Sequence, residues 1–219
     1  MSVTTVEYYA TFADRVLAGI AGQLEERNAP GVSFLSIHEI PAYLGLADIE
    51  NFAGGVTTRW HAGIDGAAVK TAIDEVVDDF DVLGIARYDR SAALLTLSPL
   101  GATAARTSIS AALSLPGRTD LAPDDVRLLD RLVERIIAGQ SPAAQYMTRN
   151  VGVRLSDLFR DLYGEWDRGR DRARAYSLLR RLSGPNFIRS TPDPSGDFTL
   201  YAHYPAFVVA GSAGRTAAR

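Results

Sequence analysis

The chain of 219 residues is 47% hydrophobic and 22% charged, and it contains no cysteine. This length suits one large domain or two small ones, and the apolar content is too high for a disordered protein. Without cysteine, disulfides, thiol nucleophiles, iron–sulfur clusters and cysteine-based zinc sites are excluded. The net charge of −3 and the isoelectric point of about 5.6 argue against a protein that coats nucleic acid over its whole surface.

The charge is distributed unevenly along the chain. Residues 1–110 hold 7 Lys and Arg against 14 Asp and Glu, whereas residues 111–219 hold 16 against 12. Lys70 is the one lysine, and every other basic residue apart from the histidines is arginine. An acidic first half and a basic second half predict two parts that meet different partners.

The first half of the chain is predicted to be mostly helical. Helices are expected over four segments: residues 5–27, 37–44, 65–80 and 98–113. The pattern is strongest in the third segment, where Val69, Ile73, Val76 and Phe80 recur at i, i+4, i+7 and i+11. Because such a spacing places apolar side chains on one face, this helix is expected to cover the core.

Turn and cap residues divide these helices. Ser36 and Glu39 have the spacing of a capping box, which predicts the start of the second helix. Residues 48–63 contain Gly54-Gly55 and are predicted to be irregular. Two short apolar runs, 85–88 and 93–97, are joined by three turn-forming residues and predict a β-hairpin.

The second half repeats this order. Residues 115–122 contain Pro116-Gly117 and are predicted to be a linker. Three helices are then expected over residues 123–138, 155–165 and 168–183, followed by a hairpin with strands at 187–191 and 198–203. The residues from Gly211 onwards are small and polar, and a disordered tail is predicted over 211–219.

Both halves therefore read as a helix, a short helix, a longer helix and a two-stranded hairpin, and this order resembles that of tandem winged-helix proteins. The segment VVDDFDVLGIARYDRSAALLTLSPLGATAAR carries the resemblance, because Leu83-Gly84 leads into a hairpin that ends before Ser98-Pro99. The segment RAYSLLRRLSGPNFIRSTPDPSGDFTLY repeats the pattern more loosely. The resemblance implies a mainly α fold with small β-hairpin wings, an α+β class, in two winged-helix domains at 1–114 and 123–210.

The second half also resembles the MukE-like "kite" subunits of bacterial SMC and condensin-type complexes. The resemblance rests on the stretches RLSDLFRDLY, RARAYSLLRRLSG and FTLYAHYPAFVVAG. It implies a non-enzymatic accessory subunit that forms a homodimer and binds a kleisin-like protein in a DNA-organising or plasmid-defence complex. A winged-helix transcriptional regulator that binds DNA is the alternative, because this fold often serves that purpose.

The predicted helix 168–183 is rich in arginine. Its basic residues and one in the following hairpin form the candidate DNA-binding set: Arg168, Arg170, Arg172, Arg174, Arg181 and Arg189. Arg170, Arg174 and Arg181 share one side of the helix and are the candidate DNA readers or phosphate clamps. The same spacing suits surface ion pairs and helix-end arginines, so both interpretations stay open.

The predicted helix 65–80 is acidic where the second one is basic. It and the residue after it carry a run of carboxylates against Lys70: Asp65, Asp74, Glu75, Asp78, Asp79 and Asp81. DNA phosphates would repel such a face, whereas a basic protein partner would fit it. Asp74 and Asp78 are therefore candidate partner-binding residues, and a merely solvated face is the alternative.

Three aromatic residues complete the candidate partner-binding set. Tyr8 and Phe12 lie at i and i+4 and predict a second apolar stripe on the first helix, which suits a dimer or a partner helix. Trp60 lies in an irregular stretch between Gly55 and Gly63. It is either an interface anchor or a plug that closes a small core.

Catalytic motifs are not found in the sequence. The Walker A run, the G-x-S-x-G elbow and the H-E-x-x-H motif do not occur. His38, His61 and His203 are far apart in the sequence, and neutral imidazoles bind metal when several converge. We therefore expect no enzyme activity, metal or cofactor. The sequence also shows neither a secretory leader nor a long apolar run, so a cytoplasmic protein associated with the nucleoid, and not with a membrane, is expected.

Overall fold

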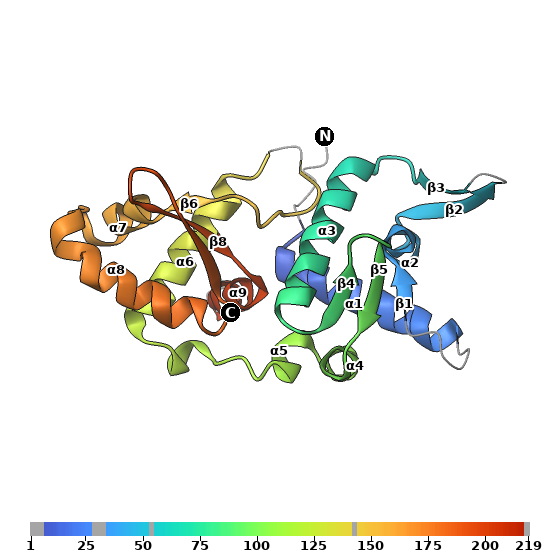
Figure 1. The fold of residues 1–219 in the computed structure, drawn as a ribbon, viewed down its shortest axis with the longest axis horizontal. Helices are drawn as coiled ribbons and strands as arrows, with labels where there is room; N and C mark the ends of the chain where they lie inside the picture. The colour runs from blue at the N-terminus through green and yellow to red at the C-terminus, as the bar shows by residue number, and fades with distance from the viewer. Residues whose placement is uncertain (1–6, 28–33, 53–54, 142–143, 217–219) are drawn as a thin grey trace. The chain divides into compact units, whose positions relative to one another are not determined.

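The computed structural model describes residues 7–27, 34–52, 55–141 and 144–216 (Figure 1). It is a mixed α+β structure with small antiparallel sheets, as the sequence predicts at this level. The chain divides into two compact units. Unit 1 comprises residues 1–114 and 143–147, and unit 2 comprises residues 115–142 and 148–219.

Unit 1 opens on its longest helix and ends on two short ones. Its elements in chain order are α1 (Tyr9–Arg27), β1 (Phe34–Ser36), the 3₁₀ turn η1 (Ile37–Glu39), α2 (Ile40–Tyr43), β2 (Ala47–Phe52), β3 (Gly55–Trp60), α3 (Gly66–Val82), β4 (Ala86–Asp89), β5 (Leu94–Leu97), α4 (Pro99–Arg106) and α5 (Ile109–Ala112). The strands form a three-stranded sheet of order β1-β5-β4 and a separate pair, β2-β3.

Local caps explain where the helices of unit 1 begin. The Asp65 carboxylate accepts the backbone N–H groups of Ala67 and Ala68 at the start of α3. The Ser98 hydroxyl accepts the N–H of Gly101 at the start of α4. Ser36 occupies the N-cap position of η1, as predicted, but its side chain makes no capping hydrogen bond, so the predicted Ser36 cap bond is not formed.

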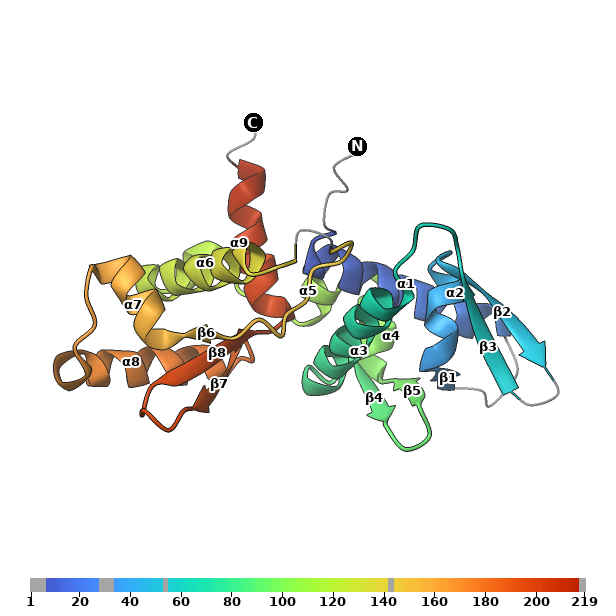
Figure 2. The ribbon, with the colours of Figure 1, turned by 90° about the horizontal axis from the view of Figure 1, so that it is seen from above.

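The β2-β3 hairpin corrects the prediction that residues 48–63 are irregular. The two strands pair antiparallel in register, with Asp48 opposite Arg59 and Ala47 opposite Trp60. Arg59 forms ion pairs with Asp48 and Glu50 across the strands. Polar and apolar residues alternate here with the period of a strand, a signal that the glycine pair obscured. The hairpin lies beside α2, apart from the three-stranded sheet (Figures 1 and 2).

Unit 2 repeats the order of unit 1 without the inserted hairpin. Its elements are η2 (Arg118–Asp120), α6 (Pro123–Ala138), β6 (Val153–Arg154), α7 (Leu155–Tyr163), α8 (Arg168–Ser183), β7 (Ile188–Pro192), β8 (Phe198–Ala202) and α9 (Tyr204–Thr216). The sheet order is β6-β8-β7, so the first strand again pairs with the third, as in β1-β5-β4. Thus α6 and α8 have the same bounds as the sequence predicts, to the residue.

The C-terminal segment differs from the predicted disordered tail. Helix α9 runs from Tyr204 to Thr216 and packs beside α6 (Figure 2). Its first turns are buried through Tyr204, Phe207 and Val209. The small and polar residues after Gly211 concealed the helix from a periodicity argument, whereas the buried residues before them anchor it.

The boundary between the predicted domains also differs in detail. The predicted linker contains η2, where Arg118 binds Asp130 at 2.5 Å and donates to the Val209 carbonyl oxygen. Residues 143–147, which the sequence placed in the second domain, belong to unit 1. There the Glu7 backbone N–H donates to the Gln145 carbonyl, and the Met147 N–H donates back to Glu7. These hydrogen bonds join positions over 130 residues apart, which no local pattern reveals.

Each unit has its own apolar core. In unit 1 the core contains Val16 and Ile20 of α1, Ile73 and Phe80 of α3, and Leu95 of β5. In unit 2 it is built from fully buried residues of several elements: Leu128, Leu132 and Ile136 of α6, Phe159 of α7, Leu200 of β8 and Phe207 of α9. Each such side chain contributes about 1.5–3 kcal/mol of burial free energy.

Candidate interaction surfaces

One side of α8 is occupied by ion pairs. Arg170 binds Glu165 at 2.8 Å and Asp171 at 3.3 Å. Arg174 and Arg181, the other two predicted DNA readers, bind carboxylates in the first turn of α6. Arg174 pairs with Asp124 at 2.5 Å. This side of α8 therefore carries little uncompensated positive charge.

The Arg181 pair is the most buried of these contacts. The Arg181 guanidinium donates three hydrogen bonds to the Asp125 carboxylate, with distances of 2.7–3.2 Å, and Asp125 is only 3% exposed. A carboxylate taken out of water requires such a partner. On the neighbouring residue, hydrogen bonds from Arg174 and then Arg127 lower the pKa of Asp124. Arg174 and Arg181 are thus paired with carboxylates of another helix, α6, rather than with neighbours on α8.

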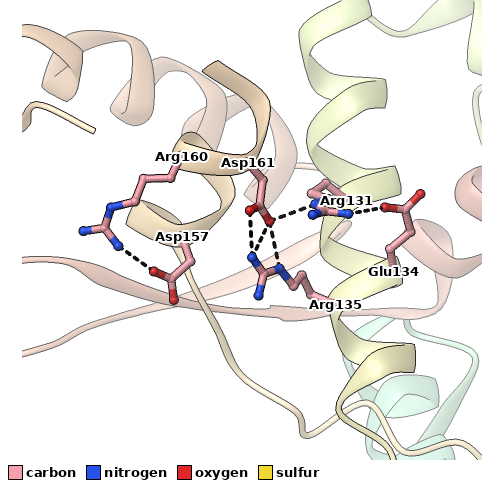
Figure 3. A network of polar contacts seen from close by, with 6 residues as sticks. All are labelled: Arg131, Glu134, Arg135, Asp157, Arg160 and Asp161. Atoms are coloured by element: carbon pink, nitrogen blue, oxygen red, sulfur yellow. Dashed lines mark hydrogen bonds and ion pairs between the residues drawn. The ribbon is translucent and has the colours of Figure 1, made fainter. Parts of the chain in front are cut away.

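Carboxylate pairing extends through unit 2. In the network of Figure 3, Asp161 of α7 binds Arg131 and Arg135 of α6, and Arg131 also binds Glu134. Throughout the described part of unit 2, each of the 12 Asp and Glu residues accepts a hydrogen bond or forms an ion pair. The acidic residues of unit 2 are therefore already engaged.

Several arginines are left over by this pairing. Five exposed arginines of unit 2 have no carboxylate within 4 Å among the described residues: Arg154, Arg168, Arg172, Arg180 and Arg189. Arg168, Arg172 and Arg189 belong to the predicted DNA-binding set, and Arg180 lies in α8 with two of them. The sequence did not indicate Arg154, because the pairing of Arg154 with Thr199 in the sheet could not be predicted from the sequence.

Four of these residues flank the β7-β8 hairpin, and we call them the hairpin-side arginines: Arg154, Arg168, Arg172 and Arg189. Arg154 is opposite Thr199 and Arg189 is opposite Tyr201, so both lie on the same face of the sheet. On this face the Arg189 guanidinium lies 4.7 Å from the Tyr201 ring centroid.

The other two approach the hairpin from α8. Arg168 donates to the Ser195 carbonyl at 3.0 Å and covers Gly196, where a Cβ atom would lie 2.2 Å from its Nη2. Arg172 lies 5.5 Å from the ring of Tyr176, which is 48% exposed. Exposed arginines beside the rings of Tyr176 and Tyr201, around one hairpin, form an arrangement that suits phosphate contacts.

Unit 1 does not present the single acidic face that the sequence predicts. Glu75 and Asp79 are 3% and 1% exposed, and the Tyr9 hydroxyl donates to Asp79 Oδ2 at 2.9 Å. Asp65 caps the helix. Of the six carboxylates, Asp74, Asp78 and Asp81 remain on the outer side of α3 with Lys70, and Asp78 binds Arg90, in the turn after β4, at 2.6 Å. The prediction is corrected because three of the six carboxylates have internal roles.

The two aromatic residues predicted at the start of α1 have different environments. Phe12 is fully buried, and its ring centroid lies 4.7 Å from that of Tyr146 in the 143–147 segment. The predicted partner contact of Phe12 is therefore wrong, because the chain itself covers this ring. Tyr8 is half-buried. The cover over Phe12 comes from a segment distant in sequence.

Trp60 closes the start of α3. Its indole lies so close to Gly66 that a Cβ atom there would be 2.3 Å from the ring. The residue is only partly buried, and it lines a groove of about 50 Å³. The other residues of the groove come from η1, α2, β3 and α3: Ile37, His38, Pro41, Thr58, Lys70, Ile73 and Asp74. This volume admits the end of one side chain and lies far below the ~300–1,000 Å³ of small-molecule sites.

The histidines occupy separate environments. His38 lines the groove, whereas His61 Nδ1 lies 3.0 Å from the Gly45 carbonyl oxygen and its Nε2 lies 3.3 Å from Asp48. His203 is buried in unit 2, with Nδ1 3.2 Å from Arg149. In the part of the chain that the structure describes, no three potential metal ligands cluster together. Likewise, none of the helices in the described ranges is long and apolar enough to cross a bilayer.

The comparisons with known proteins add no assignment. Neither the family models, nor the curated proteins, nor the solved structures contain a match to this chain. The function must therefore be argued from the residues and contacts described above.

Proposed function

We propose that the chain is a tandem winged-helix protein, a non-enzymatic accessory subunit that dimerises and binds a kleisin-like partner in a DNA-organising or plasmid-defence SMC complex. The repeated order of elements supports the winged-helix assignment, because a helix, a strand, two helices and a hairpin recur in both units. The shared sheet orders, β1-β5-β4 and β6-β8-β7, support it further. The β4-β5 and β7-β8 hairpins would then be the two wings.

The observation that carries the function is the pairing of α8 with α6. In a winged-helix DNA reader, the helix before the wing enters the major groove. Here Arg174 and Arg181 of that helix are bound by carboxylates of α6, and the equivalent helix of unit 1, α3, is acidic on its outer side. Reading a base sequence with Arg174 or Arg181 would require breaking these ion pairs. An accessory subunit that contacts protein, and DNA only through its backbone, fits this charge distribution better.

DNA contact without sequence reading belongs to the same proposal. The hairpin-side arginines have no carboxylate partners among the described residues and flank the β7-β8 hairpin. They favour binding to phosphates of double-stranded DNA, and they are also the observation that favours the second candidate, a winged-helix transcriptional regulator. The two candidates differ in whether the binding depends on base sequence.

Duplex binding by the purified protein distinguishes the two. Fluorescence anisotropy would be measured with labelled duplexes of several sequences at about 50 mM and about 200 mM salt. Four phosphate contacts give a salt slope of about −3.6, so affinity should fall on the order of 100-fold over this range, equally for every sequence. Tight binding at about 200 mM salt that selects one sequence would contradict the accessory-subunit proposal and support the regulator.

Assembly provides the complementary test. Light scattering of the purified chain should give a dimer mass, twice 23.6 kDa. Co-expression with the kleisin-like and coiled-coil ATPase subunits of one SMC system should give a complex that survives size-exclusion chromatography. A monomer that forms no such complex with any SMC system whose genes neighbour its own would refute the assembly proposal.

A further inference from the structure

The groove beside Trp60 is apolar at its base. Ile37, Pro41 and Ile73 are buried, and they come from η1, α2 and α3. Trp60 and Thr58, at the end of β3, form the opposite wall. The inserted β2-β3 hairpin thus supplies one wall of the groove, and unit 2 has no such hairpin among its described elements.

The rim of the groove holds a carboxylate without a bonded partner. Asp74 is partly buried and, among the residues that the structure describes, forms no hydrogen bond and no ion pair within 4 Å. Burial raises its pKa, although Lys70, His38 and Arg90 lie close enough to act in the opposite direction. One turn further along α3, Asp78 is bound by Arg90. A carboxylate that has lost water without gaining a donor favours the arrival of a cation.

The surroundings of the groove have the charge that such a cation requires. Residues 1–114 carry 7 basic against 14 acidic residues, and the 143–147 segment adds none. Lys70 and His38 are the titratable groups that share the groove with Asp74. Lys70 is exposed, and its flexible side chain can turn away from Asp74 towards water. Asp81 lies further along the same side of α3 and adds to the negative charge of this side.

We propose that this groove binds an arginine side chain of the protein partner, with its guanidinium on Asp74 and its aliphatic stem against Trp60 and Ile73. The volume of about 50 Å³ fits one side-chain end. A planar guanidinium can donate two parallel hydrogen bonds to a carboxylate and stack on an indole, which an ammonium cannot do. The inference rests on the proposed function, since it specifies how the partner is recognised.

A defined peptide tests the site without the unknown partner. The ¹⁵N-labelled protein would be titrated with acetyl-Leu-Arg-Leu-amide and with the neutral isostere acetyl-Leu-citrulline-Leu-amide. The chain has two tryptophans, so the Trp60 indole signal is assigned with a Trp166→Phe variant. We expect the arginine peptide to shift the Trp60 indole and the Asp74 amide, with an affinity about tenfold higher than that of citrulline, because only the charged peptide gains the ion pair.

Matched variants complete the test. Asp74→Asn should lower the affinity for the arginine peptide about tenfold, whereas Asp81→Asn, on the same side of α3 but outside the groove, should change it less than twofold. Equal affinities for both peptides, equal losses in both variants, or shifts confined to residues outside the groove would overturn the proposal. Retained spectral dispersion in each variant shows that the fold is intact.

The failure of this inference differs from the failure of the proposed function. If the SMC complex forms with the wild-type chain and forms equally well with Asp74→Asn, the arginine site is refuted and the accessory role stands. If neither protein forms the complex while the arginine peptide still binds the groove, the kleisin-like partner is refuted and the site stands. If the groove instead binds a second copy of the chain, Asp74→Asn abolishes the dimer, which overturns the assigned occupant.

Discussion

In both units a polar contact joins the start of the first helix to the end of the third helix. The carboxylate of this contact belongs to the third helix in unit 1 and to the first helix in unit 2. In unit 1 the Tyr9 hydroxyl, at the first residue of α1, donates to Asp79 near the end of α3. In unit 2 Asp125, in the first turn of α6, accepts from Arg181 near the end of α8. The contact in unit 1 therefore places its carboxylate on α3, whereas the contact in unit 2 compensates an arginine of α8.

This difference shows that sequence charge alone does not locate a binding surface. The basic side of α8 that the sequence singles out is the side that α6 compensates, and the uncompensated arginines lie around the β7-β8 hairpin. In unit 1, the buried members of the acidic run leave Asp74, Asp78 and Asp81 on the outer side of α3. The two groups thus differ in sign and in place: the carboxylates lie on α3 of unit 1, whereas the arginines surround the β7-β8 hairpin of unit 2.

The largest expected effect is on the free energy of unfolding and concerns Phe12, which the sequence predicts at an interface and the structure places in the core. Phe12→Ala should lower the free energy of unfolding by about 3–5 kcal/mol, because it removes a fully buried ring that packs on Tyr146. Chemical denaturation measures this change. The half-buried Tyr8 provides the control, and Tyr8→Ala should cost about 1 kcal/mol or less. Equal losses of unfolding free energy in both variants would contradict the assignment of Phe12 to the core.

The ion pair between α6 and α8 should give the next largest effect. Arg181→Ala leaves the Asp125 carboxylate buried without its partner and should cost about 2–3 kcal/mol of unfolding free energy, less than for a wholly buried pair because Arg181 itself is half exposed. Arg172→Ala, in the same helix, should cost under about 0.5 kcal/mol. A similar cost for both variants in urea unfolding would show that the two sides of α8 do not differ.

The helix caps test what the two units share. Asp65 caps α3, and Asp167 caps α8 by accepting the N–H groups of Gly169 and Arg170. Asp65→Ala and Asp167→Ala should each cost about 1 kcal/mol, whereas Asp65→Asn and Asp167→Asn should keep most of the cap. Thermal unfolding measures both pairs. Very different losses of unfolding free energy in Asp65→Ala and Asp167→Ala would show that the two caps do not stabilise their units equally.

The smallest expected effect is a pH dependence of opposite sign in the two units. Burial raises the pKa of Asp74 above 3.8, so its ionisation costs stability as pH rises through its folded pKa. Arg174 and Arg127 lower the pKa of Asp124 below 3.8, so its contribution is present above 3.8 and is lost as pH falls through its folded pKa. As pH rises from below 3.8 to above it, the stability of Asp74→Asn relative to wild type should therefore increase, whereas that of Asp124→Asn should decrease.

Denaturation curves across this pH range measure both variants. The same direction of change in Asp74→Asn and Asp124→Asn would mean that the two carboxylates have similar environments. That result would remove the contrast between the unpaired groove carboxylate and the paired α6 carboxylate.

Much of the fold follows from local patterns in the sequence. Apolar spacing in α3, α6 and α8, and turn residues between the strands of the two hairpins, predict these elements because each depends on neighbours in the chain. The β2-β3 hairpin was missed although its residues alternate, because the glycine pair dominated the interpretation. Helix α9 was missed because its stability comes from packing on α6, which local propensity does not report.

For the candidate surfaces, only the sign of the net charge in each half of the chain could be predicted from the sequence. The sequence indicates an acidic first half and a basic second half, and the structure keeps that contrast. Which arginines are compensated depends on pairs such as Arg174 with Asp124 and Arg181 with Asp125, separated by 50 and 56 residues. Such long-range pairs arise from tertiary packing, so spacing along one helix could not separate the two sides of α8.

The salt dependence of duplex binding by two matched double variants tests the central claim most directly. Arg172→Gln with Arg189→Gln removes two hairpin-side arginines, and Arg170→Gln with Arg174→Gln removes two arginines that carboxylates already bind. The first variant should reduce the salt slope by about 1.8, and the second should leave it unchanged within error. A slope that falls in the second variant and persists in the first would contradict the account, because DNA would then be bound by the α6-facing side of α8.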